Sequence, residues 1–218
     1  MAPSSRATLA YVAPFVLYVG MMVLGLPPQV LFPLRLVIVS AVILAISRPY
    51  LTGSPSQPLA SVAVGLAVFL IWIGPDVLFG YRHHWLFENA ITGKAGSSLP
   101  TGLQANPLFL AVRVVSSVAL VPILEELFWR GWLMRWLIRN DFLKIPLGTY
   151  QGFSFWIVAV LFASEHGPYW EVGLAAGVIY NLWVVRTRNL ANCMLAHAVT
   201  NGALAIYVLT GGHWQYWL

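Results

Sequence analysis

The chain has 218 residues, of which 59% are hydrophobic and only 9% are charged, and its net charge is +5. Ordinary globular domains carry roughly 25% charged residues, so this composition excludes a water-soluble surface and predicts lipid as the main solvent. The basic residues lie between apolar runs, so we interpret them as determinants of membrane topology and expect no nucleic-acid partner. The single cysteine, Cys193, excludes an internal disulfide.

Three apolar runs in the first half of the chain predict membrane spans. Residues 9–26 form the first, and because no cleavage site of small residues follows them, we interpret them as a span rather than a signal peptide. Residues 31–46 and 59–74 form the second and the third. Arg35 lies near the start of the second span, where its long side chain is expected to reach the membrane surface.

Residues 75–107 break this pattern, because they carry several charged residues and a cluster of Gly, Ser and Pro. We interpret them as an interfacial segment and loop outside the bilayer. The adjacent His83 and His84 have two interpretations, as metal ligands or as solvated surface residues, and their position on a loop favours the second.

Residues 106–139 are apolar and helical in character but too long for one span, since they would cover roughly 50 Å. Pro122 is expected to break this run into two helical pieces, 106–120 and 121–139. The two adjacent acids that follow Pro122 would then lie in the first turn of a helix, where negative charge is favourable.

Three further apolar runs complete the chain, namely residues 150–165, 170–185 and 190–209. Gly173 and Gly177 lie one turn apart in the middle run. Small residues at this spacing allow helices to pack closely in lipid.

These runs predict an all-α fold, a polytopic transmembrane helix bundle of seven spans, or of eight if residues 106–120 cross separately. We divide it into N-terminal membrane spans with an interfacial loop, residues 1–105, and a catalytic core in the C-terminal four helices, residues 106–218. An N-terminus on the inner side gives the expected excess of inner Lys and Arg. The inner set is Arg6, Arg48, Arg135, Arg139, Lys144, Arg186 and Arg188, and the outer set is Arg82 and Lys94.

A few ionisable residues remain inside the predicted spans. A charged group at membrane depth costs ~2.5–3.5 kcal/mol, so we interpret such residues as functional candidates. Glu126 and Arg130 are four residues apart and share a helix face, so they are expected to form an ion pair. Glu125 points about 100° away from that face and has no such partner on its own helix.

Two more pairs are four residues apart, and they are Phe162 with His166 and His197 with Asn201. Chain lengths from the basic loops place Glu125 and His166 at similar depth, in the half of the bilayer away from those loops, so we expect Glu125 to pair with His166. A carboxylate beside an imidazole can deprotonate water, and a second His with an Asn can donate hydrogen bonds to an oxyanion. These groups suffice for peptide hydrolysis without a covalent intermediate.

A buried polar network that only locks the helices together would use the same residue types, and it is the structural alternative. The convergence of all these groups favours chemistry instead. The sequence contains neither the G-x-S-x-G pattern of serine hydrolases nor the H-E-x-x-H pattern of zinc proteases.

Three motifs of the CPBP family occur in the family's order and spacing: Glu125-Glu126-x-x-x-Arg130, Phe162-x-x-x-His166 and His197-x-x-x-Asn201. This family comprises type II CAAX prenyl endopeptidases and Abi membrane proteins, and the chain resembles it over about residues 106–210. The residues around the motifs also resemble those of the bacterial CAAX-protease-related branch, which accompanies exosortase and PEP-CTERM protein-sorting systems.

The resemblance implies a glutamate-dependent intramembrane endopeptidase. Glu125 and His166 would activate the water, and His197 and Asn201 would form the oxyanion hole. The supporting residues would be Glu126, Arg130 and Phe162. The resemblance implies that the reaction needs no cofactor. The alternative is a metal ion held by the same residues. Eukaryotic prenyl proteases cleave on the cytosolic side, whereas our depth argument places this site toward the outer half.

The expected partners are the lipid bilayer and a membrane-anchored or lipidated protein or peptide substrate, in the bacterial inner membrane. A non-enzymatic scaffold or chaperone of a protein-sorting system is the alternative function, as is a transporter with a buried proton relay. The sequence leaves open the identity of the substrate, the recognition of a prenyl group and the oligomeric state.

Overall fold

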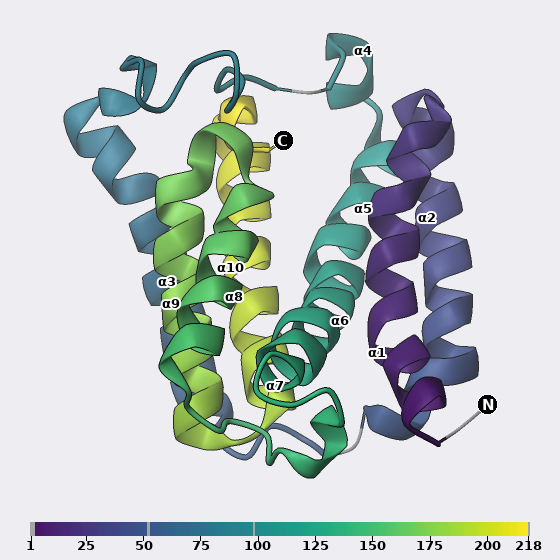
Figure 1. The fold of residues 1–218 in the computed structure, drawn as a ribbon. Coiled ribbons are helices and arrows are strands. Elements are labelled where there is room, and N and C mark those ends of the chain that lie inside the picture. The colour runs from purple at the N-terminus through teal and green to yellow at the C-terminus, as the bar shows by residue number, and fades with distance from the viewer. Residues whose placement is uncertain (1–2, 52, 98, 218) are drawn as a thin grey trace.

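The computed structural model describes residues 3–51, 53–97 and 99–217, and within them it contains helices and loops but no β-sheet (Figure 1). The all-α prediction is therefore confirmed. The helices of the bundle are α1 (Pro3–Gly20), α2 (Pro28–Val42), α3 (Pro58–Phe79), α5 (Pro107–Val115), α6 (Val121–Glu126), α7 (Met134–Trp136), α8 (Gly152–Ser164), α9 (Trp170–Thr187) and α10 (Leu190–Gly211). A short α4 (Thr101–Gln104) lies in the loop after α3.

The helix ends follow from local chemistry. Pro28, Pro58 and Pro107 each occupy the first helical position, where the missing N–H forfeits no hydrogen bond. The Asn106 side chain accepts a hydrogen bond from the Phe109 N–H at 3.1 Å and caps α5.

The expected break at Pro122 is wrong, because α5, α6 and α7 form one continuous helix from Pro107 to Trp136. A π-helical turn, Ser116–Leu120, directly precedes the proline. This turn widens the backbone ahead of Pro122 and so accommodates a residue that cannot donate a backbone hydrogen bond. The two acids therefore lie in the middle of a long helix and not in a first turn, and residues 106–120 do not form a separate crossing.

Five segments in the described part of the chain are long and apolar enough to cross a membrane: Ser5–Leu24, Pro28–Tyr50, Pro58–Phe79, Pro107–Trp136 and Leu190–Gly211. They indicate a multi-pass membrane protein. Helix α8 is apolar but has only 13 residues, and α9 carries Glu171 in its first turn. An eighth span is excluded with the separate crossing of residues 106–120, and the expected seven spans stay a prediction.

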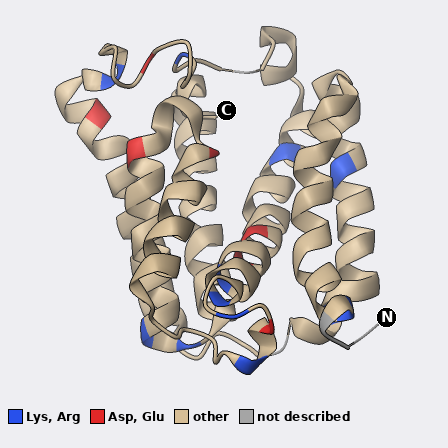
Figure 2. Ribbon diagram, in the orientation of Figure 1, with Lys and Arg blue, Asp and Glu red and all other residues tan. Residues whose placement is uncertain are grey.

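The bundle consists of two groups of helices that meet along the continuous helix (Figure 1). Helices α3, α8, α9 and α10 pack together on one side, and α1 and α2 pack against α5 and the turn after α6 on the other. Lys and Arg gather at the end of the bundle where the N-terminus lies (Figure 2). This distribution matches the predicted inner set, and the side of the membrane it faces stays a prediction.

Small residues permit the close contacts between helices. A Cβ atom at Gly177 would lie 3.1 Å from the Ala159 carbonyl oxygen on α8, and one at Gly173 would lie 3.1 Å from His166 Nδ1. The close packing expected at this pair of glycines is therefore confirmed. On α3, a Cβ atom at Gly65 would lie 2.8 Å from Val199 Cβ and closer still to a carbonyl oxygen of α10.

An ion-pair network closes the end of the bundle opposite the basic loops. Arg82 is 2% exposed, and its Nη1 donates to Glu171 at 2.8 Å while its Nε lies 3.4 Å from Asp76. The Tyr81 hydroxyl donates to the same Glu171 carboxylate at 2.9 Å. Partial burial and this hydrogen bond raise the pKa of Tyr81 to about 12. The Tyr216 hydroxyl donates to Asp76 at 2.6 Å and joins the C-terminal segment to this network.

Gly65→Ala is expected to destabilise the protein by about 1–3 kcal/mol, because the added methyl group would collide with α10. The control is Gly20→Ala at the end of α1, where the backbone is helical and a Cβ atom meets nothing within 4 Å. That change should leave stability unchanged or slightly raise it, since alanine is the better helix former. Thermal unfolding in detergent measures both, and equal melting temperatures would contradict the close α3–α10 contact.

Candidate active site

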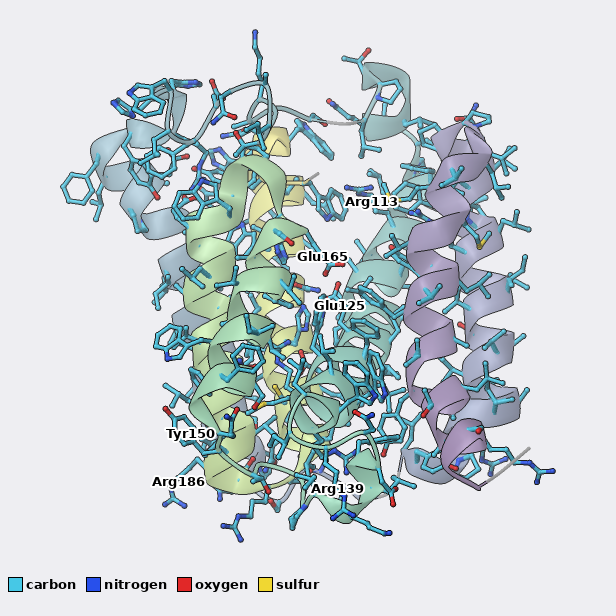
Figure 3. The ribbon with its side chains drawn as sticks, in the orientation of Figure 1. Arg113, Glu125, Arg139, Tyr150, Glu165 and Arg186 are labelled. Carbon is cyan, nitrogen blue, oxygen red and sulfur yellow. The ribbon has the colours of Figure 1, made fainter. Side chains whose placement is uncertain are left out.

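A cavity of about 510 Å³ lies between the two groups of helices. Five of the residues predicted for the site line it, and they come from three separate parts of the chain: Glu125, Phe162, His166, His197 and Asn201. Figure 3 shows Glu125 and Glu165 extending toward this space, far from Arg139 and Arg186 at the basic end. The fold therefore brings the predicted catalytic residues together.

The ion pair predicted between Glu126 and Arg130 is present behind the cavity wall. Arg130 Nη1 lies 3.1 Å from Glu126 Oε1, and both side chains are fully buried. Arg130 also donates from Nε to Asn181 Oδ1 at 2.9 Å and from Nη2 to the Gly177 carbonyl at 3.3 Å. Its guanidinium carbon lies 4.4 Å from the Phe162 ring centre, so this aromatic residue packs against the ion pair.

His197 joins the two glutamates. Its Nδ1 lies 2.9 Å from Glu126 Oε1, and its Nε2 lies 4.0 Å from Glu125 Oε2. The carboxylate of Glu126 can only accept, so the Nδ1 atom carries the proton. The Tyr180 ring stacks on the imidazole with 5.1 Å between ring centres and holds its plane. The expectation that Glu125 pairs with His166 is wrong, because among the described residues its ion pair is with His197.

His166 is oriented by its own helix. Its Nδ1 lies 2.8 Å from the Phe162 carbonyl oxygen, which can only accept, so this nitrogen carries the proton. The neutral ring then presents the lone pair of Nε2 as an acceptor. The Trp72 ring packs edge-on against the imidazole with 5.1 Å between ring centres. The absence of a side chain at Gly173 gives the ring its space.

Asn201 reaches across to the continuous helix. Its Nδ2 donates to the Ser117 carbonyl at 2.7 Å, and Ser117 belongs to the π-helical turn before Pro122. A π-helical turn shifts the register of the backbone hydrogen bonds, which is one way for a carbonyl to become available to a side chain. The amide has a second N–H that this bond does not use.

The C-terminal part of the chain matches a model of a known protein family. Residues 107–203 match the model described as type II CAAX prenyl endopeptidase Rce1-like, which is a protease family, and they make up less than half of the chain. Residues 107–203 are therefore similar to this family, and we call them the Rce1-like domain. No curated protein and no solved structure matches the chain. The three motifs all lie inside the Rce1-like domain, whereas the narrower resemblance to the exosortase-associated branch has no support from this match.

Several residues in or behind the cavity wall were missed from the sequence. Glu165 lines the cavity one residue before His166, and its charge beside a motif residue was the available signal. Asn181 binds Arg130, and its amide in an apolar run was a similar signal. The expectation that Arg35 reaches the membrane surface is wrong, since this residue is 4% exposed and lines the cavity. No sequence pattern indicated which way it points.

The histidine pair outside the Rce1-like domain fits the solvated interpretation. His83 is 82% exposed at its side chain and lies 3.3 Å from Glu88. The described residues contain no cluster of three or more His, Cys, Asp or Glu side chains that could hold a metal ion.

Gly173→Ala is expected to displace the His166 ring, because the new methyl group would lie 3.1 Å from Nδ1 and 3.2 Å from Cβ. Nitrogen NMR of protein labelled at its histidines should show a neutral His166 ring protonated at Nδ1, assigned as the signal that is lost in His166→Gln. Gly173→Ala should shift or broaden that signal. Gly202→Ala is the matched control, since a Cβ atom there meets Val118 at an ordinary 3.8 Å. An unchanged spectrum for Gly173→Ala would contradict the packing described for His166.

Proposed function

We propose that the chain is an intramembrane endopeptidase that hydrolyses a peptide bond in a membrane-tethered or lipidated protein, using water activated by Glu125 and His166. The observation that carries this proposal is the meeting of Glu125, His166, His197 and Asn201 in one cavity of the Rce1-like domain. Sequence motifs alone establish spacing along a helix, whereas the cavity brings side chains of three helices within reach of one ligand.

The water-activating side of the site consists of two acceptors. Glu125 supplies a carboxylate, and His166 supplies the lone pair of Nε2, because its Nδ1 proton is bound to the Phe162 carbonyl. A water molecule between two acceptors donates one hydrogen bond to each and directs its own lone pair elsewhere. Glu125 is then the group that takes the proton, and His166 orients the water.

The proposed oxyanion hole consists of donors. Asn201 has one amide N–H to spare after its bond to Ser117. His197 uses its Nδ1 proton on Glu126, so it donates from Nε2 only when the ring is protonated. In that state its positive charge lies 4.0 Å from Glu125. Two donors aimed at a developing oxyanion in a water-poor cavity stabilise the tetrahedral intermediate far better than they would in water.

Glu126 and Arg130 support this arrangement from behind. Their ion pair gives His197 an anionic acceptor at a fixed position, which sets the orientation of the imidazole. Neither side chain is exposed to the cavity, so we assign them a positioning role.

Glu125→Gln is expected to reduce cleavage by at least about 10²–10⁴-fold, because glutamine cannot take a proton from water. The substrate is found first as the membrane protein that accumulates uncleaved in a strain lacking the gene. The rate of its cleavage is then compared in purified wild-type and variant protein. Asp141→Asn is the control, since this partly exposed residue pairs with Lys144 in the loop after α7 and does not line the cavity.

The same experiment separates the alternatives. Cleavage by the Glu125→Gln protein would contradict the proposal, and complementation of the deletion strain by both Glu125 and His197 variants would favour a non-enzymatic scaffold. A metal-dependent hydrolase is distinguished from the proposed mechanism by elemental analysis of the purified protein and by its sensitivity to chelators. The association with an exosortase system, the bacterial inner membrane and the absence of a cofactor stay predictions.

A further inference from the structure

Arg35 on α2 differs from Arg82 and Arg130, which are also deeply buried. Arg82 pairs with two carboxylates and Arg130 with one. Arg35 is 4% exposed and forms no ion pair within the described part of the chain. Its Nε and Nη2 atoms are buried and have no hydrogen-bond partner among the described residues.

Aromatic rings surround this guanidinium. Its carbon lies 4.5 Å from the centre of the Tyr18 ring and 6.0 Å from that of Phe32. Such contacts offset part of the cost of burying the charge. They do not satisfy the Nε and Nη2 groups in the guanidinium plane, and Arg35 lines the same cavity as Glu125.

Two further donors lie on the facing helix. The guanidinium carbon of Arg113 lies 4.7 Å from the same Phe32 ring, and Arg113 lines the cavity. Ser116 follows one turn later, is 2% exposed, and has a hydroxyl without a hydrogen-bond partner among the described residues. Figure 3 shows Arg113 on the continuous helix, between Glu125 and the end of the bundle away from the basic loops.

The Nε and Nη2 groups of Arg35 and the hydroxyl of Ser116 are buried without a partner among the described residues, which is costly, and an anion compensates them. A carboxylate fits best, because its two oxygens match the fork of N–H groups on a guanidinium. We propose that Arg35, with Arg113 and Ser116, forms a subsite that binds a carboxylate of the peptide substrate. The inference rests on the proposed function, since it places a peptide in the cavity.

The position of the subsite defines the substrate further. Residues 113 and 125 are twelve positions apart on one helix, which corresponds to roughly 18 Å. An extended peptide covers about 3.3–3.6 Å per residue. The carboxylate therefore lies about five residues from the scissile bond, either as the end of the peptide chain or as an acidic side chain.

The test measures binding in the full-length Glu125→Gln protein, in nanodiscs of zwitterionic lipid. The probes are an acetylated apolar hexapeptide with a free terminal carboxylate, its terminal amide, and an amide whose last residue is glutamate. We expect the free acid or the glutamate peptide to bind at least about tenfold more tightly than the apolar amide. The preferred probe identifies the source of the carboxylate.

Arg35→Gln is expected to remove this preference by weakening the acidic probe about tenfold and leaving the amide unchanged. The control is Arg48→Gln, which removes an exposed arginine at the far end of the same helical segment and should keep the preference. Equal binding of acidic and amide probes by the protein that retains Arg35 would overturn the proposal. So would an Arg35→Gln effect confined to phosphatidylglycerol nanodiscs, which would assign the subsite to lipid phosphate.

A stability measurement separates a binding role from a structural one. Without ligand, Arg35→Met should keep or raise the melting temperature, because it replaces an unpaired buried charge with an apolar side chain. A clear fall would make Arg35 a structural residue and contradict the proposal. Binding is measured independently of turnover, so cleavage by the Glu125→Gln protein would refute the proposed function without deciding the anion preference.

Discussion

The buried ion pair between Glu126 and Arg130 is the interaction on which the geometry of the site depends. Arg130 binds the side chain of Asn181 and a carbonyl on α9, while Glu126 binds His197 on α10. Two charges in a dry interior are tolerated only when each is well paired, and removal of one partner costs about 3–5 kcal/mol. The pair therefore joins the continuous helix to α9 and α10, and it fixes the position of Glu125, one residue earlier in the chain.

Features carried by a single helix could be predicted from the sequence. The Glu126–Arg130 pair and the three motif spacings follow from helical geometry alone, and the apolar runs located the long helices to within a few residues. Contacts between helices could not be predicted, because they depend on rotation and register that no single run contains. His197 rather than His166 lies beside Glu125 for this reason. The helix break at Pro122 was predicted wrongly because the π-helical turn before this residue has no sequence signature.

The N-terminal half contributes more than additional spans. Tyr18, Arg35 and Trp72 line the cavity although they lie outside the Rce1-like domain of residues 107–203. The chemical groups of the proposed reaction come from the domain, whereas part of the wall that a ligand would meet comes from α1, α2 and α3. Under the proposed function, the domain would supply the reaction and the N-terminal helices would help to select the ligand.

The central claim is that two adjacent glutamates have separate roles, one in chemistry and one in positioning. The most direct test compares the free energy of unfolding of Glu125→Gln and Glu126→Gln in the same detergent. Glu126→Gln should lose about 3–5 kcal/mol, because Arg130 stays buried without its counter-charge, whereas Glu125→Gln should remain within about 1 kcal/mol of the wild type. Equal losses in the two variants would contradict this account.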